Sequence, residues 1–253
     1  MIDRHLMKLR ARDPISPGEE AFIRASVREV INVSADRIVV REQQPLDFCT
    51  ILTSGIAARR KDMRDGRRQF TELHVPGDFT DLHSFTLKYL DHDIVALSDC
   101  SFAVVPHERL TYIMKNYPHL AWVYWFGTNL DAAIHREWEV SLGSRSAIAR
   151  MAHLFCELYI RLEMVELVSD GSYDLPLSQQ ELGEMLGITS VHTNRTLQQL
   201  RKQGCVEFTG GVVTITDLDA LKQAAEFNPA YLYLDRHGRG STGQYSAAVK
   251  VPV

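Results

Sequence analysis

Residues 178–203, SQQELGEMLGITSVHTNRTLQQLRKQ, constrain the fold more than any other part of the chain. Ser178 and Glu181 form a capping-box pattern at the start of a first short helix with an apolar face. A Gly-Ile-Thr turn follows, opened by a glycine that can adopt positive φ, and Thr189 or Ser190 can cap a second helix. Two helices joined by a short turn containing Gly are a helix-turn-helix, whose second helix can enter the major groove of DNA.

The polar side chains of the second helix are arranged to read DNA. Arg195 has a planar donor fork that suits guanine O6 and N7, and its neighbours on the N-terminal face can reach base edges. Basic side chains further along, and polar ones at the start of the first helix, suit phosphates. The expected DNA contacts are Ser178, Gln179, Thr189, Ser190, Val191, His192, Asn194, Arg195, Arg201 and Lys202.

Two further features bear on this interpretation. Residues 204–215, GCVEFTGGVVTI, read as a two-stranded hairpin, the wing of a winged helix, which a solvated helical hairpin would not need. The chain has a net charge of −4, which alone argues mildly against a nucleic-acid partner. Between Ile188 and Val206, however, there are three basic residues and no acid, so the recognition segment is locally basic. Non-specific affinity should be modest, and binding should depend on base contacts and dimer geometry.

The first half of the chain has a different texture. Ser16, Pro17 and Glu19 predict a capped helix over about 17–26. Residues 31–102 contain short β-prone runs broken by turn signals, with a strong hairpin signal at Asp65-Gly66. This spacing predicts a sandwich or jelly roll.

After Pro106 the hydrophobic period shifts towards 3.6. Helices are predicted over 107–116, from 118 to about 142, and over about 144–165; the second would span about 37 Å. Both of its flanks are apolar, and a 3-4-3-4 stripe predicts a homodimer seam, with packing on its own domain as the alternative. The seam residues are Leu120, Val123, Gly127, Leu130 and Ile134.

The chain resembles the Crp/Fnr superfamily of bacterial transcription regulators over about residues 20–215, through the Gly77-Asp78-Phe79 turn, the long helix and the winged-helix signature. The resemblance implies an α+β fold: a double-stranded β-helix (jelly roll) that senses an effector, a dimerisation helix and a winged helix-turn-helix. We place these at 1–117, 118–143 and 144–227, with a tail at 228–253.

The resemblance also implies the function. The chain would be a sequence-specific DNA-binding transcription regulator, a homodimer reading a palindromic operator with half-sites about 34 Å apart. Double-stranded DNA and RNA polymerase are the expected partners. Arg195 matches the family's base-reading pattern. Val191 departs from it, because many members place a Glu there, so the half-site should differ from that of the cyclic-AMP receptor.

The sensor departs from the family pattern more strongly. Cyclic-nucleotide-binding members have a Gly-Glu pair where this chain has Asp81-Leu82, and no Arg occurs between Arg68 and Arg109. We therefore expect that cyclic AMP and cyclic GMP do not bind tightly. No cysteine precedes Cys49, so an N-terminal iron–sulfur cluster is not expected. No cofactor is required, and the effector is unknown. The candidate effector pocket comprises Gly77, Asp78, Asp81, His83, Asp91 and His92.

Two alternatives concern this histidine- and aspartate-rich region. The region also contains His74 and Asp93. One alternative is that its histidine and aspartate side chains are metal or haem ligands, and the other is that they are hydrogen-bonded loop residues. A cupin-like, metal-dependent enzyme domain fused to a helical module would need an HxH or HxD pair, whereas His92 and Asp93 are adjacent and face opposite sides of a strand. We expect a regulator and not an enzyme.

Composition adds few constraints. The 253 residues are 45% hydrophobic, enough for a packed core. The N-terminus has no apolar signal core, and the longest uncharged stretch, 116–130, is too short to span a membrane, so a cytoplasmic location is expected. The four cysteines should be core thiols. The Gly/Ser-rich tail should be mobile, except for a docked run at 231–234.

Overall fold

The computed structural model describes residues 1–234. The helices are α1 Asp3–Arg12, α2 Pro17–Ala25, α3 Ser84–Leu87, α4 His107–Asn116, α5 Pro118–Ser144, α6 Ala147–Glu163, α7 Gln179–Leu186, α8 Ser190–Lys202, α9 Leu218–Ala225 and the 3-10 helix η1 Pro229–Leu232. The strands are β1 Glu29–Val33, β2 Ile38–Val40, β3 Phe48–Ser54, β4 Ala57–Asp62, β5 Arg68–His74, β6 Asp93–Ala96, β7 Cys100–Pro106, β8 Ser172–Asp174, β9 Val206–Thr209 and β10 Val212–Ile215. The expectation of a mobile tail concerns residues from 235 onward, which lie outside the described residues.

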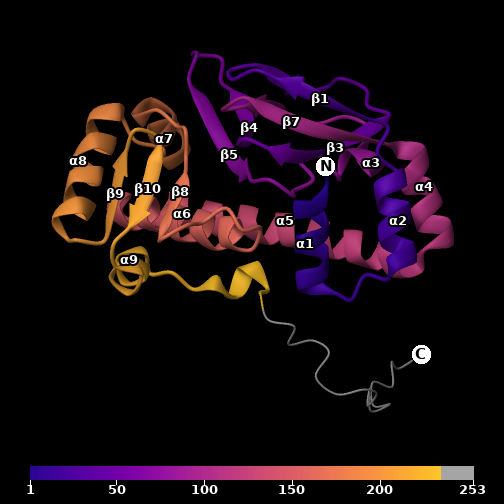
Figure 1. The fold of residues 1–253 in the computed structure, drawn as a ribbon. Helices are drawn as coiled ribbons and strands as arrows, with labels where there is room; N and C mark the ends of the chain where they lie inside the picture. The colour runs from indigo at the N-terminus through magenta and orange to yellow at the C-terminus, as the bar shows by residue number, and fades with distance from the viewer. Residues whose placement is uncertain (235–253) are drawn as a thin grey trace, which may run out of the picture.

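The predicted roll consists of two antiparallel sheets (Figure 1). One has the strand order β1-β7-β3 and the other β2-β6-β4-β5. The predicted hairpin at Asp65-Gly66 joins β4 to β5, with Gly66 at φ +83°. Phe102 is fully buried with Leu52 and Ala57 inside the roll, whereas Phe70 and Leu73 are fully buried in the cluster that the roll shares with α5 and α6.

Helix α1 was not predicted from the sequence. It packs on the turn after β5, where Gly77 adopts φ +98° and a Cβ would lie 2.8 Å from the carbonyl oxygen of Arg4. His5 Nδ1 donates to the Gly77 carbonyl oxygen at 2.8 Å. Only glycine permits this approach, so the Gly-Asp-Phe turn is also the surface against which α1 packs.

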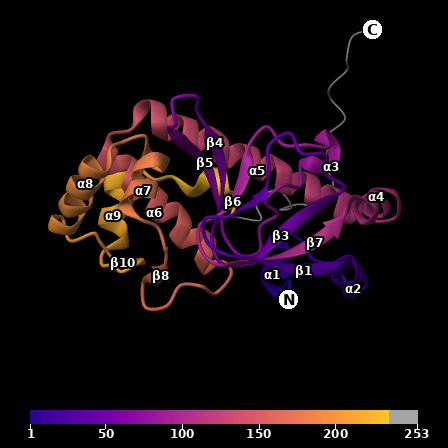
Figure 2. The same cartoon turned by 90° about the horizontal axis from the view of Figure 1, so that it is seen from above.

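Helix α5 runs beside the roll towards the C-terminal half of the chain (Figure 1, Figure 2). It begins at Pro118 and ends two residues beyond the predicted end. Its roll-facing side packs against β5, the turn at 77–83 and α1, and contributes Ile134 and Trp138 to the core.

The predicted dimer seam on α5 is wrong for three of its five residues. Leu120, Val123 and Ile134 are buried within the chain, and Gly127 and Leu130 line a cavity between α5 and the roll. The alternative interpretation, packing on the helix's own domain, describes this face. A 3-4 stripe shows that a helix face is buried, but it does not show which partner buries it.

The C-terminal half contains the predicted two helices and the wing (Figure 1). Strand β8 adds to the wing hairpin, giving the order β8-β10-β9. After α9 the chain returns towards α5 as a strap, residues 226–234, in which Leu232 is buried and the Tyr231 hydroxyl donates to Glu157 at 2.8 Å. The prediction that residues 231–234 dock is confirmed.

One hydrophobic cluster runs from the roll through α5 and α6 into the wing, so the two halves share a core. The prediction of core thiols is confirmed, because Cys49, Cys100, Cys156 and Cys205 are buried and free. None of the helices within residues 1–234 has the length and apolar character to cross a membrane.

Candidate functional site

The helix-turn-helix geometry follows from its caps and glycines. The Ser178 hydroxyl accepts from the Glu181 N–H while the Glu181 carboxylate accepts from the Ser178 N–H, which confirms the capping box. Gly187 ends α7 at φ +64°, and the Thr189 hydroxyl accepts from the His192 N–H to begin α8. At Gly183, a Cβ would lie 2.6 Å from the Ile188 carbonyl oxygen. The close crossing of α7 and α8 therefore requires glycine at that position.

All ten side chains predicted to contact DNA are exposed on this motif. Val191 is 70% exposed, so its side chain can contact a base edge. Asn194 donates to Gln179 Oε1 at 3.2 Å, which ties the N-terminal ends of the two helices together. The arrangement presents a continuous polar and basic face of the shape that enters a major groove.

The cations of this face differ in their surroundings. Arg195 is exposed and makes no ion pair with any residue from 1 to 234, so its fork is available for a base edge. Arg201 Nε lies 3.4 Å from a carboxylate oxygen of Glu207 on the wing strand β9. Both groups are largely exposed, so the pair is weak and a phosphate can replace the carboxylate.

The predicted effector residues come only partly together. Gly77, Asp78 and His83 line the cavity beside α5. Asp81 is fully buried elsewhere, accepting from the Thr50 N–H at 2.6 Å, and burial raises the pKa of its carboxyl to about 7. Asp91 is exposed, with its carboxylate 2.8 Å from His92 Nδ1. Burial lowers the pKa of His92 to about 4, so this pair is neutral imidazole beside carboxylate at pH 7.

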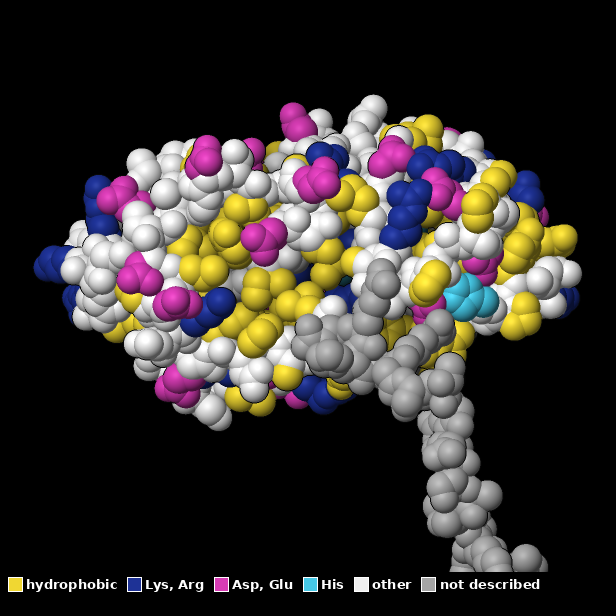
Figure 3. Space-filling view, turned by 60° about the horizontal axis from the view of Figure 1, so that its bottom comes forward, with side chains coloured by type: hydrophobic (Ala, Val, Ile, Leu, Met, Phe, Trp, Pro, Cys, Tyr) yellow, Lys and Arg dark blue, Asp and Glu magenta, His cyan; other side chains and the backbone are white. Residues whose placement is uncertain are grey.

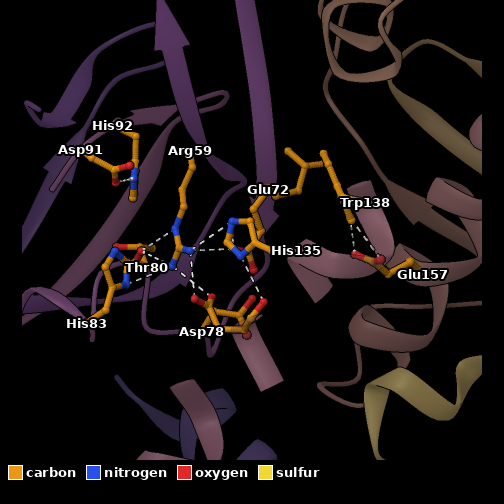
Figure 4. Close-up of polar contacts among 12 residues, drawn as sticks. Arg59, Glu72, Asp78, Thr80, His83, Asp91, His92, His135, Trp138 and Glu157 are labelled. Carbon is orange, nitrogen blue, oxygen red and sulfur yellow. Dashed lines mark hydrogen bonds and ion pairs between the residues drawn. The ribbon is translucent and has the colours of Figure 1, made fainter. Parts of the chain in front are cut away.

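The central residue of this region is Arg59 on β4, which was not among the residues predicted from the sequence (Figure 4). Its guanidinium lies 2.9 Å from Glu72 Oε2 and 2.9 Å from Asp131 Oδ2, and it donates to the Thr80 carbonyl oxygen at 3.0 Å. Its side chain is 4% exposed. No arginine occurs between Arg68 and Arg109, but the fold brings Arg59 into this region from outside that range, already paired with two carboxylates.

The pKa values of Glu72 and Asp131 are shifted in opposite directions. Burial raises the pKa of Glu72 well above its usual value, with Arg59 acting in the opposite direction. Burial also acts on Asp131, but Arg59 outweighs it and lowers the pKa of Asp131 to about 2. Arg59 is already paired with both carboxylates, so this buried site offers no free cation to an incoming phosphate.

Glu72, Asp131 and His135 each place one possible metal-ligand atom within 4.8 Å of the others. Asp131 and His135 are one turn apart on α5, a spacing that could have signalled the cluster in the sequence. Arg59 donates to this set, with its Nη1 3.4 Å from His135 Nε2, so a metal cation would have to displace a guanidinium. The cluster also contains a single histidine, unlike the two-histidine iron site of the enzyme alternative. We assign no metal to it.

A second buried chain of charges connects the roll to the DNA-binding half. Asp78 pairs with Lys8 on α1 and with Arg161 on α6, the latter at 2.9 Å. Arg161 also pairs with Glu157 at 2.8 Å, and Glu157 accepts from Trp138 Nε1 (Figure 4). Burial opposes ionisation of Asp78, but Lys8 and Arg161 outweigh it and hold its pKa below its usual range. The effector turn is thereby ion-paired to the helix that leads into the winged helix.

Comparison with known proteins covers both halves of the chain. Residues 30–117 match the family described as "Cyclic nucleotide-binding domain", and residues 149–224 match "Crp-like helix-turn-helix domain". The chain is 29% identical over 216 residues to the transcriptional activator protein FnrL of Cereibacter sphaeroides, covering 82% of this chain and 84% of that one. It is 27% identical over 195 residues to the nitrogen fixation regulation protein FixK of Bradyrhizobium diazoefficiens, covering 75% and 78%. The solved structure of FixK2 from Bradyrhizobium japonicum has a TM-score of 0.71 at 24% identity, covering 78% of this chain and 96% of that one.

Proposed function

Because the chain belongs to the Crp/Fnr superfamily of transcription regulators, we propose that it acts as a homodimer that reads a palindromic operator through α8. The observation that carries this proposal is the exposed face of the helix-turn-helix, with Arg195 unpaired within residues 1–234. In the dimer, two copies of α8 enter successive major grooves about 34 Å apart. Arg195 contacts guanine, and Val191 contacts a thymine methyl or no base group.

The outer face of α5 supports the dimer. Opposite the buried stripe, a second 3-4 stripe of exposed side chains follows the helix: Trp122, Trp125, Asn129, Ala132, Arg136 and Val140. Trp125 is 65% exposed. Figure 3 shows hydrophobic side chains gathered across the middle of the underside of the molecule, with charged side chains around them. An exposed aromatic stripe of this kind is typical of a helix-pair interface, and Asn129 would set its register.

The dimer is tested by the molar mass of Trp125→Glu in solution. Placing a carboxylate within the outer stripe of α5 should convert the dimer to a monomer at micromolar concentration. Light scattering after size exclusion measures the change. Tyr89→Glu, which changes an aromatic residue of comparable exposure on the roll, is the matched control and should remain dimeric. A dimeric Trp125→Glu protein would place the interface elsewhere.

The operator is tested by selecting bound sequences from a random DNA pool. Two inverted half-sites, with centres one helical turn or a whole number of turns apart, are expected. An asymmetric or unspaced motif would contradict a symmetric dimer reading DNA with α8.

We further propose that the chain controls transcription rather than catalysing a reaction. The effector is not a cyclic nucleotide, because the ribose-binding Gly-Glu pair is replaced by Asp81-Leu82 and the nearby Arg59 is already paired with Glu72 and Asp131. RNA polymerase is the proposed protein partner at the promoter. Activation or repression would follow from where the operator lies relative to that promoter.

A further inference from the structure

A cavity of about 130 Å³ lies where α1, the turn at 77–83, α5 and the strap meet. Most of its wall is apolar, with contributions from Leu9, Phe79, Val123, Phe126, Ile134 and Leu232. Since a water needs on the order of 10 to 15 Å³ of such volume, the cavity can hold a ligand of about ten non-hydrogen atoms. Pockets with a mainly apolar wall and few polar groups are typical of small-molecule sites.

The charges on the wall are paired with one exception. Asp78 is held by Lys8 and Arg161, and Arg59 is held by Glu72 and Asp131.

Arg12, on α1, is the exception within residues 1–234: Nη1 is buried and has no acceptor, and no carboxylate pairs with the side chain. Its Cζ lies 5.7 Å from the centre of the Phe126 ring. Burial lowers the pKa of Arg12 to about 10, so it stays charged at pH 7. A buried donor without an acceptor is unfavourable, and an anionic group in the cavity would satisfy it.

We propose that this cavity binds a small monocarboxylate with an apolar body, its carboxylate on Arg12 and its body against α5 and the strap. A guanidinium fork matches the two oxygens of a carboxylate. A single charge is favoured over a phosphate dianion, because Glu72, Asp78 and Asp131 lie on the same wall. The site goes beyond the proposed reading of DNA: it includes Gly77, Asp78 and His83 of the candidate effector pocket, and α1 and the strap complete it.

The bound acid would contact both halves of the chain. Leu232 and Leu234 of the strap line the cavity, and the strap follows directly from α9 of the DNA-binding half. Arg12 and Phe79 belong to the sensor half. A ligand held between them would stabilise the docked position of the strap.

The test is calorimetric titration of octanoate, which has ten non-hydrogen atoms, into the full chain without DNA. We expect one site per chain. Arg12→Gln should weaken binding by about tenfold or more, because a charge-assisted bond is lost. Arg10→Gln, on the exposed side of the same helix, should leave it unchanged. Octan-1-ol, which has the same apolar body without the charge, should bind the wild-type chain at least about tenfold more weakly than octanoate.

A second variant tests the cavity without touching a charge. Gly127 lines it, and a Cβ there would meet no atom within 4 Å, so Gly127→Leu should fill the space. Leucine also favours the helix over glycine, so the fold should be retained, as thermal unfolding would show. Octanoate binding should be lost. No binding by the wild-type chain, or equal binding by either Arg12→Gln or Gly127→Leu, would overturn the proposal. Because the titration contains no DNA, that failure would leave the operator-reading proposal untouched.

Discussion

Replacing Arg59 with Gln should destabilise the protein through the two carboxylates that it leaves behind. Glu72 lies opposite Arg59 in the β4–β5 register and is 2% exposed, so water cannot hydrate its carboxylate. Asp131 is 24% exposed and can be partly hydrated. Removing one partner of a buried ion pair costs about 3 to 5 kcal/mol. Since one of the two carboxylates is partly hydrated, we expect a loss of about 3 kcal/mol in the free energy of unfolding.

The sign of the pH dependence follows from Glu72. Its pKa in the folded protein is raised above the unfolded value, so the folded state binds the proton more tightly. Stability is therefore lost as the pH rises from about 4.5 through the folded pKa, and the Arg59→Gln deficit should shrink as the pH falls towards 5.

Urea unfolding at pH 7.5 and pH 5 measures both effects from the midpoint and slope. The double variant Arg59→Gln/Glu72→Gln, which removes the stranded charge, should recover about half of the loss or more. A single variant within about 1 kcal/mol of wild type, or a double variant no more stable than the single one, would refute the assignment of Arg59 as the neutralising cation.

Two shorter predictions concern the helix-turn-helix and the sensor. Ser178→Ala removes the hydroxyl that caps α7 and should cost about 1 kcal/mol of stability. DNA affinity should also fall, because the start of α7 frays. Ser172→Ala, on β8, is the comparison variant. An unchanged urea midpoint would contradict the capping role. Cyclic AMP should give no tight binding by calorimetry, and a dissociation constant in the micromolar range would show that Arg59 can be released to a phosphate.

The sequence predicted elements whose signals are local. The capping boxes, Pro118 and the Asp65-Gly66 turn fixed the starts of α2, α5 and α7 and the β4–β5 hairpin, because caps and turns depend on neighbouring residues. The helix-turn-helix was predicted for the same reason. Helix α1 and strand β8 carry no comparable signal, since each is stabilised by distant segments.

The errors concern relations between distant segments. Arg59 and Glu72 meet through strand register, and Asp131 reaches them from a helix about sixty residues further on, so neither contact is visible in the sequence order. On α5, stripes with 3-4 spacing occur on both sides. The sequence showed that both flanks of the helix are apolar, but which flank packs on the roll depends on the shape of the roll.

The central claim, that α8 reads DNA through Arg195, is tested most directly by the specificity ratio of Arg195→Ala on the selected operator. Two lost guanine contacts, at about 1 to 3 kcal/mol each, should bring operator affinity down towards the non-specific level, while affinity for random DNA changes little. Arg67→Ala, an exposed arginine in the β4–β5 hairpin, should behave as wild type. An Arg195→Ala protein that protects the same operator with unchanged affinity would contradict the account.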